Sequence, residues 1–127
     1  MDLAMYILIN KDVDIVKADG TGAGKLAGQS GHAVSAFVYH KFIKNGGTAT
    51  NEERKQFENY MEGTQKKILL RCSQKNLEEL EKKGYIAIRD KGLTMLEPNT
   101  LTCVNFGILD RDKDEVPKWI KKLQLYK

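Results

Sequence analysis

The chain has 127 residues, 41% of them apolar and 30% charged, which is enough to bury one core without disulfide or metal staples. It has two cysteines, no CxxC motif and two histidines, which argues against a structural zinc site. The net charge of +4 favours an anionic partner such as RNA but also suits many ordinary domains. Along the chain, the first predicted element is a strand over residues 5–10, apolar on both faces as in a sheet covered on both sides.

The N-terminal apolar run is too short to cross a membrane, and it lacks the basic flank and cleavage site of a signal peptide. We therefore expect an intracellular, cytoplasmic protein. Cys72 and Cys103 each lie in a short aliphatic run, which favours buried free thiols over a disulfide.

The next predicted element is a long helix over residues 24–44, preceded by a polar, glycine-rich stretch. Its periodicity places Leu26, Ser30, Ala33, Val34 and Phe37 on one side and Lys25, Gln29, His32, Ala36 and His40 on the other. The later elements are a short helix opened by a capping box at residues 50–53, a strand at 67–72, a helix from Ser73 to Gly84, strands at 85–89 and 100–108, and a helix at 116–123 with Pro117 in its first turn.

Strands that alternate with helices predict an α/β fold: a three-layer sandwich in which one mixed sheet of about four strands has helices on both faces. We expect residues 1–127 to form a single domain. Such folds bind ligands at the carboxyl ends of strands, beside helix N-termini. Two places are therefore candidates for the ligand site. One is the start of the long helix at Gly24 and Lys25, and the other is the loop that begins at Asp90.

Polar residues that could take part in binding or catalysis lie at both places. Lys25 and Gln29 are four residues apart at the start of a helix, which suits an oxyanion- or phosphate-binding pair, although a solvated helix face has the same pattern. His32 shares that side, where a structural role is the commoner one. Asp90 ends a predicted buried strand and Thr94 follows in a loop, so Asp90 is either an acid placed for proton transfer or a turn residue.

The glycine cluster at residues 20–24 permits a nucleotide-binding interpretation. A P-loop would need a glycine at position 19 and Ser or Thr at position 26, where the chain has Asp19 and Leu26. Residues 22–27 match a GxGxxA fingerprint, but the preceding predicted strand ends more than ten residues earlier. A flexible loop that leads into a helix fits better.

Two spaced motifs together resemble the peptidyl-tRNA hydrolase 2 family of archaea and eukaryotes. Residues 24–33, GKLAGQSGHA, are similar to its GKxAAQxxHA motif, and IRDKGLT at 88–94 with PNT at 98–100 is similar to its IRDxGxT…PxT block. Residues 63–68, GTQKKI, resemble the family's entry into the second strand. The resemblance covers Tyr6 to about Leu125. It departs in a longer stretch at 12–24, in Gly28 for Ala, in Asn99 for Gly, and in Gly107-Ile108 for a Gly-Pro turn.

The resemblance implies hydrolysis of the ester bond of peptidyl-tRNA, releasing peptide and free tRNA, by a homodimer without metal or nucleotide cofactor. From the short N-terminal apolar run we also expect no membrane partner. The resemblance places Lys25, Gln29, Asp90 and Thr94 in the catalytic cleft, with Gly24, His32 and Thr100 in support. Asp90 would orient and partly deprotonate a water while Lys25 stabilises the oxyanion or a phosphate of the CCA end. Whether Asp90 is the base or only orients Lys25 stays open.

RNA affinity would come from lysines that meet phosphates, with a strong salt dependence. The candidates are Lys41, Lys44, Lys66, Lys67, Lys91, Lys118, Lys121 and Lys122. Trp119 could stack on a base, but its apolar helical neighbours favour a core position.

Three other functions remain as alternatives. The first is a non-catalytic member of the same fold that binds tRNA, another RNA or a protein. The second is a βαβ nucleotide-binding enzyme that uses the loop at Gly20 to Gly24, and the third is a dimeric structural protein without a ligand.

Overall fold

The structure is a computed structural model that describes residues 1–91 and 98–126. Its centre is β1 (Leu3–Asn10), every residue of which is buried. The sheet has the strand order β2-β1-β4-β3. β1 pairs in parallel with β2 (Lys67–Cys72) and antiparallel with β4 (Leu101–Asp110), which pairs antiparallel with β3 (Ile86–Arg89). The predicted mixed four-stranded sheet is therefore confirmed.

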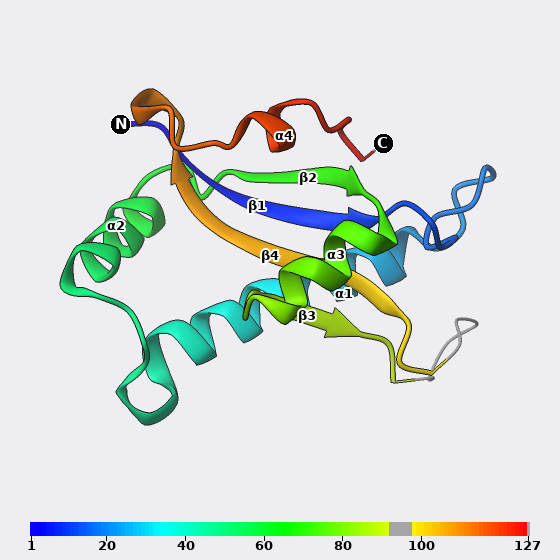
Figure 1. Cartoon of the computed structure of the whole chain (residues 1–127), viewed down its shortest axis with the longest axis horizontal. Helices are drawn as coiled ribbons and strands as arrows, with labels where there is room; N and C mark the ends of the chain where they lie inside the picture. The colour runs from blue at the N-terminus through cyan, green and yellow to red at the C-terminus, as the bar shows by residue number, and fades with distance from the viewer. Residues whose placement is uncertain (92–97, 127) are drawn as a thin grey trace.

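Helices cover both faces of this sheet, as predicted for an α/β sandwich (Figure 1). On one face, α3 (Gln74–Lys82) and the short α4 (Lys118–Lys121) supply Leu77, Leu80 and Ile120 to a core cluster. On the other, α1 (Ala23–Val38) and α2 (Asn51–Glu62) supply Ala33, Phe37 and Tyr60 to a second cluster. The apolar side predicted for α1 thus faces the sheet.

Most helix boundaries follow from local capping chemistry. The Thr50 side chain accepts from the Glu53 amide and the Glu53 carboxylate accepts from the Thr50 amide, so the predicted capping box opens α2. Ser73 caps α3 and Pro117 is the N-cap of α4. The helix predicted to run to residue 44 is shorter, because a π-helical turn (Tyr39–Ile43) and a 3-10 turn (Lys44–Gly46) follow α1; another 3-10 turn (Arg111–Lys113) follows β4.

The glycine-rich stretch before α1 folds back on itself. Gly22 is the N-cap of α1 with φ of 98°, and a Cβ atom there would lie 1.8 Å from the Ile15 carbonyl oxygen. Only glycine combines that left-handed conformation with so close an approach. This glycine is therefore explained by packing against Ile15.

The carboxyl ends of β1, β2 and β3 lie at one end of the sheet, where the N-terminus of α1 also lies (Figure 1). This is the end at which the sequence predicts the ligand site. Cys72 and Cys103 are both buried free thiols, as predicted. In the described part of the chain, none of the helices has the length and apolar character needed to cross a bilayer.

Candidate active site

An ion pair joins the two places that the sequence singles out. Lys25 is in the first turn of α1, and Asp90 directly follows β3. The Lys25 Nζ lies 2.7 Å from Asp90 Oδ2, a charge-assisted hydrogen bond. The side chain of Asp90 is 3% exposed and that of Lys25 is 15% exposed. A nearly buried carboxylate is therefore held against an ammonium that solvent still reaches.

The backbone of Asp90 is fixed as well as its side chain. Its amide donates to the Thr100 carbonyl over 2.8 Å, and its carbonyl accepts from the Asn99 amide over 2.5 Å. Asn99 adopts a left-handed conformation, with φ of 65°. Glycine adopts this conformation without strain, and asparagine is among the few other residues that tolerate it.

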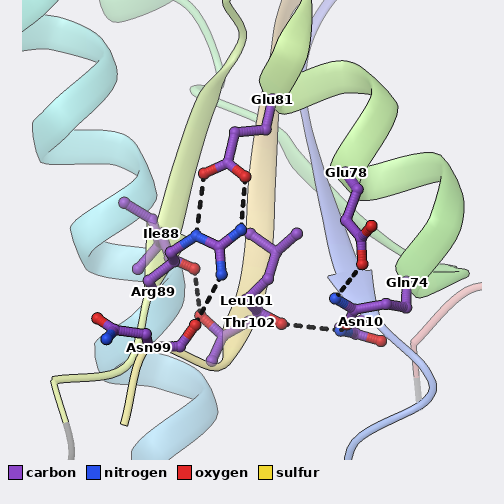
Figure 2. Close-up of polar contacts among 9 residues, drawn as sticks. All are labelled: Asn10, Gln74, Glu78, Glu81, Ile88, Arg89, Asn99, Leu101 and Thr102. Carbon is purple, nitrogen blue, oxygen red and sulfur yellow. Dashed lines mark hydrogen bonds and ion pairs between the residues drawn. The ribbon is translucent and has the colours of Figure 1, made fainter.

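Gln29 lies one turn along α1 from Lys25 and contacts the sheet. The Thr102 hydroxyl lies 2.7 Å from the Gln29 Oε1 position and 3.0 Å from the Ile88 carbonyl oxygen (the latter contact is drawn in Figure 2). A hydroxyl has one proton and the carbonyl can only accept, so the two contacts are satisfied together when the Gln29 amide N–H faces Thr102. Gln29 is thus fixed on β4, beside the strand end that leads to Asp90.

The other residues that the sequence analysis singled out lie in different environments. Thr100 contributes its carbonyl to Asp90, as described above. Gly24 is exposed in the first turn of α1, and a Cβ atom there would meet nothing within 4 Å. His32 is exposed on α1. Thr94 lies outside the described residues.

Three residues at this end of the sheet were missed by the sequence analysis, namely Thr102, Arg89 and Glu81. The signal for Thr102 was a polar residue in the otherwise apolar run from Leu101 to Val104. No local pattern could indicate that Arg89 meets Glu81, because the two are on different elements. The core position predicted for Trp119 is wrong, since this residue is 38% exposed with its ring edge-on to Phe106.

The chemistry available here is that of a paired cation and anion with amide and hydroxyl hydrogen bonds beside a helix N-terminus. The positive end of the α1 macrodipole and Lys25 both favour a negative charge at this position. Burial of Asp90 and its ion pair restrict the carboxylate to one orientation. Within residues 1–91 and 98–126, no group of three or more His, Cys, Asp or Glu side chains is arranged to hold a metal ion.

Comparison with known proteins adds independent evidence. The family model described as "Peptidyl-tRNA hydrolase PTH2" matches residues 3–126. Three similar proteins are each named peptidyl-tRNA hydrolase. One from Thermoplasma volcanium is 31% identical (84% of this chain, 86% of the relative), one from Methanopyrus kandleri 36% (76% and 83%), and one from Haloquadratum walsbyi 35% (91% and 99%). With a family match over nearly its whole length, the chain belongs to the peptidyl-tRNA hydrolase PTH2 family.

Proposed function

We propose that this protein hydrolyses the ester that joins a peptide to tRNA, with Lys25 and Asp90 at the reacting centre. The observation that carries this proposal is the ion pair between these two residues, beside the N-terminus of α1, in a chain of the PTH2 family. The names of the archaeal relatives support the same reaction. The family match from residue 3 to 126 supports treating residues 1–127 as one hydrolase domain.

In the proposed mechanism, water adds to the ester carbonyl carbon. Asp90 orients the water and accepts one of its protons, and Lys25 stabilises the negative charge that develops on the carbonyl oxygen. The bond between the carbonyl carbon and the ribose oxygen then breaks. The ribose oxygen receives the proton from Asp90, which leaves free tRNA and a peptide carboxylic acid. That acid then releases its remaining proton to solvent as the carboxylate. Because an ester is an activated acyl compound, this modest set of groups is sufficient.

Gln29 and Thr94 complete the proposed catalytic set. Gln29 is held at Thr102 and can present its remaining amide atoms to the water or the ester. Thr94 keeps its place in the proposal from the family resemblance of the IRDKGLT segment. Gly24, His32 and Thr100 are supporting residues, of which Thr100 acts through its carbonyl on the Asp90 backbone.

The same proposal includes a tRNA acceptor end as the bound RNA, a homodimer as the working form, and the cytoplasm as the place of action. The excess of Lys and Arg over Asp and Glu supports an anionic partner. The homodimer follows from the family resemblance, and light scattering on purified protein measures it directly.

The decisive experiment measures release of free tRNA from an N-acetylated aminoacyl-tRNA at low salt. We expect wild type to cleave, and Lys25→Ala and Asp90→Asn each to lose at least about 100-fold in kcat/KM. Lys55→Ala on α2 and Asp14→Asn change exposed residues of the same types and serve as matched controls. Circular dichroism verifies that each variant is folded. Binding of tRNA without cleavage by wild type would replace the proposal with a non-catalytic tRNA-binding function.

A further inference from the structure

A guanidinium fork connects α3 to the end of β3. Arg89 donates from Nε to Glu81 Oε2 over 3.1 Å and from Nη2 to Glu81 Oε1 over 2.6 Å, a bidentate pair (Figure 2). This geometry fixes the plane of the guanidinium as well as its position. The hydrogen bonds that Arg89 donates, together with its positive charge, hold the pKa of the Glu81 carboxyl below its ordinary value.

The third guanidinium nitrogen extends this connection to the chain beside Asp90. Arg89 Nη1 donates to the Asn99 carbonyl over 2.7 Å (Figure 2), while the Asn99 amide donates to the Asp90 carbonyl. The register of β3 on β4 also shifts between Ile88 and Arg89, so regular strand pairing is interrupted just before Asp90. The fork therefore connects α3 to the segment beside Asp90, next to the point where the register of the ladder shifts.

The helix at the other end of the fork is firmly held. Leu77 and Leu80 anchor α3 in the core. Its Gln74 and Glu78 lie at i and i+4 with Glu81 at i+7, so all three share one face. Gln74 accepts a hydrogen bond from the fully buried Asn10 at the end of β1 and donates to Glu78 over 2.7 Å (Figure 2). This polar face thus reaches the ends of β1 and β3 together.

We infer that Glu81 and Arg89 are positioning residues that hold Asp90 in its reactive orientation through Asn99. The inference rests on the proposed function and adds two residues to its site. The side chains of Arg89 and Glu81 are 41% and 35% exposed, and ion pairs so open to solvent contribute little to stability. The three hydrogen bonds of Arg89 instead fix the plane of its guanidinium. One of them ends at Asn99, whose amide donates to the Asp90 carbonyl, so their effect is to orient Asp90.

The test compares Glu81→Ala with Glu79→Ala in the N-acetylated aminoacyl-tRNA assay. Glu79 is an exposed acid on the same helix, and alanine preserves helix propensity at both positions. Glu81→Ala leaves the positive charge of Arg89 intact. We expect kcat to fall roughly tenfold with KM within about twofold for Glu81→Ala, and Glu79→Ala to match wild type.

Variants of Arg89 separate geometry from charge. Arg89→Lys keeps the charge but lacks the fork, so we expect it to lose kcat about as Arg89→Met does. Arg111→Met is the matched control, because Arg111 is similarly exposed and faces Asp2 at the other end of β4. If Arg89→Met raises KM alone and Arg89→Lys restores it, Arg89 is a phosphate contact and the inference is overturned.

A second readout does not depend on turnover. Amide hydrogen exchange of Asp90 reports the hydrogen bond from its N–H to the Thr100 carbonyl. We expect faster exchange in Glu81→Ala than in Glu79→Ala. Unchanged exchange together with wild-type kcat in Glu81→Ala overturns the inference while leaving hydrolysis by the wild type in place. An inactive wild type instead contradicts the proposed function itself.

Discussion

The Thr102 hydroxyl lies between the Gln29 side chain on α1 and the Ile88 carbonyl on β3, at 2.7 and 3.0 Å. One buried hydroxyl thus ties the helix that carries Lys25 to the strand that leads to Asp90. The distance between the two charged residues depends on how these elements are docked.

Thr102→Val removes this hydroxyl while keeping the shape of the side chain. Since the Ile88 carbonyl and the Gln29 amide lose a partner in a buried place, we expect the free energy of unfolding to fall by about 1 kcal/mol. We also expect kcat for tRNA release to fall severalfold. Thr102→Ser keeps the hydroxyl and should retain most of the activity. Equal activity of the valine variant and wild type would contradict a role for this contact.

Gly28→Ala should stabilise the protein. Gly28 is exposed within α1, and a Cβ atom there would meet nothing within 4 Å. Replacing glycine by alanine inside a helix contributes up to about 1 kcal/mol, which thermal unfolding resolves. Gly22→Ala is the opposite case, because its left-handed φ and the nearby Ile15 carbonyl leave no room for a methyl group. A lower melting temperature for Gly28→Ala than for wild type would show that the helix face is covered.

Variants of Asn99 test the left-handed turn beside Asp90. Asn99 has a φ of 65°, which glycine adopts without strain, so Asn99→Gly should fold at least as stably as wild type and keep its activity. Asn99→Val places a β-branched residue in a conformation that it strongly disfavours, and we expect a loss of roughly 1–2 kcal/mol. Chemical denaturation measures both variants. Equal stability of the glycine and valine variants would contradict the strain argument.

The buried thiols predict a loss of stability at alkaline pH. Burial raises the pKa of Cys72 to about 11 and that of Cys103 to about 12, from 9.0 for a free thiol. Between pH 9 and 11, the folded state therefore keeps protons that the unfolded state has lost, so the free energy of unfolding falls as pH rises. Denaturation of wild type and Cys103→Ala across this range should give a flatter decline for the variant. Parallel declines would contradict burial of the Cys103 thiol.

The fold was largely predictable from the sequence because its signals are local. The apolar run of β1, the capping box at Thr50 and Glu53, and Ser73 before α3 each act within a few residues. The end of α1 was placed too late. The apolar spacing continues through Phe42, although the backbone changes to a π-helical turn at Tyr39.

The candidate site likewise contains residues that local sequence signals indicate and residues that only the fold brings together. The sequence predicts Lys25, Gln29 and Asp90 as site residues because each lies near a helix start or a strand end, where α/β folds bind ligands. Their partners Thr102, Asn99 and Glu81 lie on other elements, and strand register and helix docking decide these contacts. The bulge between Ile88 and Arg89 is a further departure from regular pairing that alternation of side chains could not reveal.

The position of β1 in the sheet has a consequence for how the chain folds during synthesis. β1 leaves the ribosome before the other strands of its sheet, and its neighbours begin much later in the chain, β2 at Lys67 and β4 at Leu101. Until β4 has emerged, the apolar strand β1 has an unpaired edge. Such an exposed edge is prone to aggregation or chaperone binding. The core of this protein therefore closes late, and pairing between distant segments sets the rate at which it forms.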